Sequence, residues 1–252
     1  MAGNASSEEG VYRTSGGYEV PWRARRRSGT KAPGLRVSPR QGVVVTLPLG
    51  SRLDPRDVLR RYDTWLERAV RRTAGQRQAY LQSQEAPEAV TFPVSDETWR
   101  VDYHETASSR IQVRLDANLG LVRLSGAVTQ DQLVRKALQR FVKLRAEDVL
   151  PELLRLVSRD AGIPYTSCRV SSARSRWGSC STTGAIMLSD RLMFLPQHLA
   201  VHVCLHELSH IPHPDHQSGF HALLGRLDPE ADEHVAQLKV AMALVPGWMD
   251  PE

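Results

Sequence analysis

Short runs of alternating apolar and polar residues dominate the first half of the chain. Such runs, rich in β-branched residues and bounded by glycine or proline, are typical of strands with one buried face. They cover residues 35–37, 43–46, 99–103, 111–115 and 121–124, and two further short runs follow at 168–171 and 185–188. The sequence therefore predicts a β-rich, mainly antiparallel N-terminal region.

Apolar residues at helical spacing predict helices between and after these strands. A helix over residues 54–70 begins with an Asp-Pro pair, which is typical of a helix start. A longer amphipathic helix is expected over residues 133–157, where Pro151 should kink or divide it. Another is expected between the prolines at 196 and 212. The expected fold class is α+β.

These elements divide the chain into three expected parts. Residues 1–17 are small and polar, so we expect a disordered tail. The β-rich region then covers residues 18–127, and a C-terminal region covers residues 128–252. The sequence shows no internal repeat.

Composition excludes several classes of protein. No stretch approaches the ~20 apolar residues of a membrane-spanning helix, and the first residues lack the apolar core of a secretory signal. The three cysteines, Cys168, Cys180 and Cys204, form neither a complete disulfide set nor a thiolate zinc pattern. We expect a cytoplasmic protein without a membrane partner.

Charge is distributed unevenly along the chain. Residues 13–40 hold eight basic side chains and one acid, whereas residues 196–252 hold two basic side chains and eight acids. A basic segment of this kind can bind nucleic acid or phosphate. We favour a solvated, arginine-rich strand face, because no aromatic stacking pattern or nucleic-acid-binding motif accompanies the charge.

Histidines are concentrated near the end of the chain, with eight of the nine between residues 198 and 234. Among them His206, Glu207 and His210 form an H-E-x-x-H pattern. On a helix, residues i and i+4 share one face, so both imidazoles can reach one metal ion with the glutamate beside it. The alternative is an exposed amphipathic helix with two chance histidines.

A third ligand would complete a catalytic zinc site and make residues 128–252 the zinc-binding catalytic region. We favour His216, since zinc sites with three histidines are well attested; Glu230 or Glu233 is the alternative. His198 and His202 continue the helical register of the motif, but one ion cannot use four histidines on turns that lie ~5.4 Å apart. We therefore interpret those two as surface or supporting residues.

These residue types fit hydrolysis at zinc. The ion lowers the pKa of its bound water towards ~7 and polarises a carbonyl group, and Glu207 is the expected general base. Possible substrate or transition-state contacts are Arg174, Arg176 and His221. Carboxylates that could orient the histidines are Asp215, Asp228, Asp232 and Glu233.

Several of these residues together resemble the YgjP-like zinc-dependent metallopeptidases, which are related to the SprT-like proteases. The matching features are R-W-G-S-C at 176–180, the apolar run at 185–188, Pro196, H-E-x-x-H, His216 and Phe220. The resemblance extends over most of residues 18–240. It implies a minimal zincin-like α+β catalytic region, a Zn²⁺ cofactor held by His206, His210 and His216, and a peptide or protein substrate.

Three positions depart from the family pattern. Arg174 replaces a usual lysine and keeps its charge, His202 stands where an aromatic residue is common, and His221 replaces a tryptophan. His221 adds an imidazole near the site that the family pattern does not contain. None of the three removes a ligand or the base.

The R-W-G-S-C segment allows two interpretations. We favour a buried turn formed by Trp177 and Gly178 that supports the metal-binding helix. Alternatively, the strand at 185–188 could bind an extended peptide along its edge. Cys180 is interpreted as a packing residue, because no activating partner for a nucleophile is visible.

Three functions remain open at this point. The leading hypothesis is a zinc metallopeptidase. A zinc-dependent nucleotide phosphohydrolase is the alternative suggested by the basic segment, although no phosphate-binding loop is present. A nonenzymatic module stabilised by zinc is the third. The sequence specifies neither the substrate nor the oligomeric state.

Overall fold

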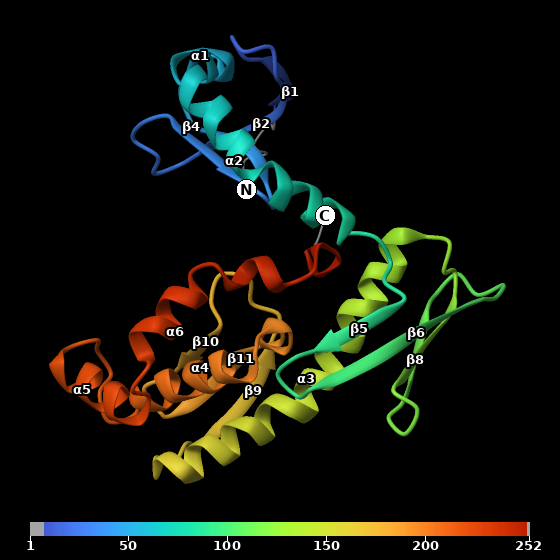
Figure 1. Ribbon diagram of the computed structural model, residues 1–252, viewed down its shortest axis with the longest axis vertical. Helices are drawn as coiled ribbons and strands as arrows, with labels where there is room; N and C mark the ends of the chain where they lie inside the picture. Colours follow the sequence, from blue (N-terminus) through green and yellow to red (C-terminus); the bar gives the residue numbers. More distant parts are fainter. Residues whose placement is uncertain (1–7, 251–252) are drawn as a thin grey trace. The chain divides into compact units, whose positions relative to one another are not determined.

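The computed structural model describes residues 8–250 and divides into two compact units, one ending at Ser83 and the other beginning at Gln84. Both units combine helices with β-sheets (Figure 1). The expected α+β class with a β-rich N-terminal region is confirmed. Within residues 8–250, no helix has the length and apolar character needed to cross a membrane.

The first unit packs a four-stranded sheet against two helices. Its elements are β1 (Glu8–Arg13), β2 (Glu19–Arg27), β3 (Gly34–Ser38), β4 (Gly42–Pro48), α1 (Pro55–Arg61) and α2 (Asp63–Gln82). The strand order is β1-β2-β4-β3, with β2 and β4 parallel and the outer pairs antiparallel. Alternate residues of β2 and β4, such as Trp22 and Val45, form a core with Leu59 and Leu66 of the helices.

The other face of β2 carries much of the basic charge. Arg23, Arg25 and Arg27 are exposed and alternate with the buried side chains of this strand. Period-two alternation sends successive side chains to opposite faces of a sheet. The charge thus lies on an exposed strand face, as the alternation predicts.

The second unit begins with a sheet of the same topology. Its strands are β5 (Ala89–Phe92), β6 (Glu97–Glu105), β7 (Gln112–Asp116) and β8 (Leu121–Gly126), and the order is β5-β6-β8-β7. The central pair is again parallel, the outer pairs are antiparallel, and a helix follows the fourth strand. The architecture therefore repeats although the sequence shows no repeat, because alternation of apolar residues needs no particular residue identities.

A three-stranded sheet and the remaining helices complete this unit. They are α3 (Asp131–Ala161), β9 (Ser167–Ser171), β10 (Gly178–Cys180), β11 (Ala185–Ser189), α4 (Gln197–Ser209), α5 (Ser218–Leu227) and α6 (Ala231–Leu238). A short 3₁₀ turn, η1 (Asp190–Phe194), joins β11 to α4, and two more, η2 (Ala241–Leu244) and η3 (Gly247–Met249), follow α6. The strand order is β10-β11-β9, so β11 is central and β10 lies at an edge.

Helix α3 connects the two sheets of this unit (Figure 1). The ring of Phe141 lies 5.5 Å from that of Phe92 and 5.4 Å from that of Trp99. Leu150 and Leu154 are fully buried on either side of Pro151, and the helix continues through the proline without a break. Of the kink or division expected at Pro151, the division does not occur, because burial on both sides offsets a helix penalty of about 3 kcal/mol.

The boundaries of the expected parts also change. Residues 8–13, assigned from sequence to a disordered tail, form β1; the expected tail over residues 1–7 lies outside the described residues. The structural division follows Ser83 and not residue 127, because β5–β8 share a core with the C-terminal helices. The helix expected over residues 54–70 is interrupted at Tyr62.

Replacing Gly126 with alanine should destabilise the second unit. Gly126 has a φ of 141°, and an added Cβ would lie 1.9 Å from the carbonyl oxygen of Arg110. The backbone must move, at a cost of about 1–3 kcal/mol or more. Calorimetry should show a Tm lowered by about 2–4 °C for each kcal/mol lost.

Gly225→Ala on α5 is the matched control, since nothing lies within 4 Å of its added Cβ. Alanine favours a helix interior by about 0.5–1 kcal/mol over glycine. The control should keep or raise the Tm. Equal Tm values for the two variants would contradict the prediction.

Candidate metal centre

The H-E-x-x-H motif occupies the end of α4, with His206 and Glu207 in its last turn and His210 as its C-cap. Cys204 before the motif and Leu208 within it are buried and fix this helix on the core. The amide of His213 then donates to the carbonyl of Ser209 at 3.2 Å, which turns the chain back toward the helix.

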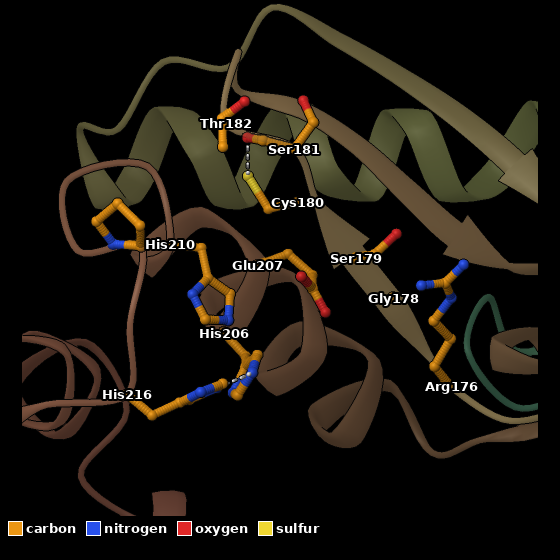
Figure 2. A pocket seen from close by; sticks show the side chains of 11 residues that line it. Arg176, Gly178, Ser179, Cys180, Ser181, Thr182, His206, Glu207, His210 and His216 are labelled. Carbon is orange, nitrogen blue, oxygen red and sulfur yellow. Dashed lines mark hydrogen bonds between the residues drawn. The ribbon is translucent and has the colours of Figure 1, made fainter.

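This turn brings His216 to the other two histidines (Figure 2). The ring centroids lie 5.0 Å apart for His206 and His210, 4.6 Å for His210 and His216, and 5.2 Å for His206 and His216. One ligand atom from each ring lies within 4.8 Å of those of the other two. The structure therefore brings together the three histidines that the sequence selected.

The geometry of this group fits zinc. The Nε2 atoms of His206 and His216 lie 3.3 Å apart. Two nitrogen ligands at ~2.0–2.1 Å from a tetrahedral ion would lie ~3.3–3.4 Å apart. Burial, with charge on His210 and the other nearby histidines, lowers the pKa of His206 to about 4, so this imidazole is neutral at pH 7 and offers a lone pair.

Phe220 of α5 supports all three imidazoles. Its ring centroid lies 5.0 Å from that of His206 and 4.7 Å from those of His210 and His216. The side chain is 1% exposed. A rigid aromatic ring in this position limits how far the histidines can rotate.

Glu207 is buried beside this group and is covered by β10. Burial raises the pKa of Glu207 to about 7, while the charge of Arg176 and the backbone N–H of Cys180 act in the opposite direction. A Cβ added to Gly178 would lie 2.7 Å from a Glu207 carboxylate oxygen. Gly178 thus permits a close approach of strand and carboxylate, a role that no local sequence signal shows.

The segment that leads into β10 is anchored on η1. The hydroxyl of Ser172 donates to Asp190 Oδ2 at 2.6 Å, and the hydroxyl of Ser189 donates to the carbonyl of Ala173 at 2.8 Å. The amide of Ser189 also donates to the carbonyl of Trp177 at 2.8 Å. These contacts fix the course of the chain that carries Arg176.

The histidines, Glu207 and β10 line one pocket of about 340 Å³. Its lining residues are Arg176, Gly178, Ser179, Cys180, Ser181, Thr182, His206, Glu207, His210, Pro214 and His216. In Figure 2, Glu207 stands between the histidines and Arg176. Arg176 lies at the pocket, whereas Arg174 and His221 are not among its lining residues.

The other carboxylates expected near the ion have different positions. Asp228 accepts hydrogen bonds from His202 and His234 and not from the three converging histidines. Glu233 accepts a hydrogen bond from Gln237, and Glu230 has an oxygen 3.6 Å from His234 Nε2. Asp215 and Asp232 do not line the pocket.

The interpretation of residues 185–188 as a free edge is wrong. These residues lie in β11, which pairs with β10 on one side and β9 on the other, so its backbone groups are already used. The edge strand beside Glu207 is β10, which the sequence did not predict. Cys180 of β10 has a pKa raised by burial and by Glu207, which keeps its thiol protonated and agrees with a packing role.

Comparison with known families finds a metallopeptidase domain. The model of the YgjP-like metallopeptidase domain matches residues 31–241. The chain therefore belongs to the YgjP-like metallopeptidase family. No curated protein matches the chain.

A solved structure with local similarity is the metallopeptidase zymogen of Pyrococcus abyssi abylysin. It shares 21% sequence identity over 36% of this chain and 92% of its own, with a TM-score of 0.34.

Gly178→Ala should displace Glu207 without removing the histidines. The added methyl group would overlap the carboxylate, and a displacement of about 1 Å in a reacting group can cost about 100-fold in rate. Hydrolysis of a quenched fluorescent peptide library should fall by that order, while zinc content by mass spectrometry stays unchanged. Gly225→Ala is the control, and wild-type activity in Gly178→Ala would refute the steric argument.

Proposed function

We propose that the chain is a zinc-dependent metallopeptidase in which His206, His210 and His216 hold the ion and Glu207 is the general base. The observation that carries the proposal is the convergence of three imidazoles beside a buried glutamate in one pocket. The family membership supports the reaction class.

A zinc ion at this position would supply Lewis-acid chemistry, which polarises a peptide carbonyl and makes water more acidic. Glu207 then accepts the proton of the attacking water on a carboxylate oxygen and passes it to the leaving amine. A pKa of about 7 suits both steps, since the group is basic enough to take the proton and acidic enough to release it.

Arg176 is the best placed of the candidate electrophiles. It lines the pocket, and its charge already influences the pKa of Glu207. We assign it to the negative charge that develops on the carbonyl oxygen, where a cation at the pocket stabilises the transition state. Arg174 and His221 have no comparable position.

The edge strand β10 favours an extended peptide as substrate. Residues 179–182 of this strand and the turn that follows line the pocket next to Glu207. A peptide can add to a sheet edge by main-chain hydrogen bonds and place its scissile bond by register. A nucleotide would gain nothing from a strand edge, so the peptide is preferred to the phosphoanhydride.

Glu207→Gln should keep zinc and lose hydrolysis. The amide preserves the shape of the side chain but cannot accept the proton, which removes a contribution of about 10²–10⁴ in rate. Zinc content and peptide-library cleavage are measured in parallel. Glu152→Gln, an exposed exchange on α3, is the control. Full activity in Glu207→Gln would exclude this glutamate as the base.

His216→Ala should bind one zinc ion fewer than the wild type and lose peptide hydrolysis. Two remaining histidines hold zinc much more weakly than three, because each ligand contributes to the affinity. Mass spectrometry after dialysis against metal-free buffer measures the loss. His104→Ala replaces an exposed histidine of β6 and should change nothing. Unchanged zinc in His216→Ala would exclude His216 as the third ligand.

A further inference from the structure

A second group of metal-binding side chains lies one helical turn before the first. It consists of His202 on α4, Asp228 at the end of α5 and His234 on α6. Their exposed fractions are 2%, 7% and 8%, so all three are buried. The catalytic proposal uses none of them.

Both imidazoles direct the same kind of atom to the same carboxylate oxygen. The Nδ1 atom of His202 lies 2.5 Å from Asp228 Oδ2, and the Nδ1 atom of His234 lies 2.8 Å from it. The second carboxylate oxygen, Oδ1, accepts the backbone N–H of Glu230 at 3.2 Å. Two nitrogens and one carboxylate oxygen therefore lie within 4.8 Å of one another.

From this convergence we propose a second site for zinc or a similar divalent transition metal, held by His202 Nδ1, His234 Nδ1 and Asp228 Oδ2. Two imidazoles and a carboxylate form a donor set that such ions accept. Ligand atoms at ~2.0–2.1 Å from a tetrahedral ion lie ~3.3–3.4 Å from each other. The two nitrogen–oxygen distances, 2.5 and 2.8 Å, would therefore lengthen by about 0.5–0.9 Å when the ion enters.

The surroundings of the group support metal binding. Histidine ligands usually direct their second nitrogen at a carboxylate or carbonyl group. His234 Nε2 lies 3.6 Å from a Glu230 carboxylate oxygen. The backbone amide of Glu230 donates to Asp228 and so fixes the orientation of the Asp228 carboxylate. His198 is engaged elsewhere, since its Nε2 lies 3.1 Å from Gln237 Oε1.

This site differs from the first in its access to solvent. The ring centroids of His202 and His206 are 6.4 Å apart, and none of the three side chains lines the pocket at Glu207. Because burial closes this site to a substrate, its ion would have a structural role. The ion would tie α4 to the α5–α6 segment and so hold the helix that presents His206 and Glu207.

Metal stoichiometry tests the proposal. The tag-free protein is loaded with zinc, dialysed against metal-free buffer and analysed by mass spectrometry. The wild type should hold two zinc ions per chain, Asp228→Asn and His216→Ala one each, and the double variant none. Asp232→Asn, an exposed acid of α6, is the matched control and should hold two.

One zinc ion in the wild type, or two in Asp228→Asn, would overturn the proposal. The group would then be a hydrogen-bonded one, in which His202 and His234 donate N–H groups to the buried Asp228 carboxylate. If Asp228→Asn fails to fold by circular dichroism, His234→Gln replaces it, and cobalt titration of the wild type gives an independent endpoint of one or two ions. His216→Ala tests the catalytic site alone and Asp228→Asn tests the second site alone. Comparison of their zinc contents therefore distinguishes failure of the second site from failure of the catalytic one.

Discussion

The close approach of β10 to α4 is the contact on which the pocket depends. Glu207 is 6% exposed because the backbone of β10 covers it, and that coverage requires a residue without a Cβ at position 178. The same approach lets the Cys180 amide reach the carboxylate. Desolvation by β10 therefore raises the pKa of Glu207, and the neighbouring charge of Arg176 acts in the opposite direction.

The metal-binding helix is held in place from several sides. Its apolar residues enter the core that α3 shares with both sheets. Phe220 restrains the three converging imidazoles, and the His202–Asp228–His234 group connects the helix with α6. Ligands that are already oriented lose less conformational entropy when an ion binds, so this support contributes directly to metal affinity.

The sequence predicted what depends on local periodicity. His206 and His210 could be placed on one face because i and i+4 spacing defines a helix face, and alternation located the strands now seen as β3, β4 and β6–β8. Contacts between distant segments carry no such signal. Gly178 against Glu207, and Asp228 between two histidines, depend on how separate elements pack, which explains why the carboxylates beside the histidines could not be chosen from sequence.

The two sheets of the repeated four-strand topology pack against different elements, and only the second packs against elements that support the metal centre. The first sheet forms its core with α1 and α2, through residues such as Leu47 and Leu66. The second sheet instead contributes Phe92, whose ring lies 5.7 Å from that of Phe194 in η1. Since η1 also holds Asp190, which anchors the segment leading to Arg176, a change in the core of the second sheet reaches the pocket through directly packed groups. The second sheet is thus part of the scaffold of the metal centre, although none of its residues lines the pocket.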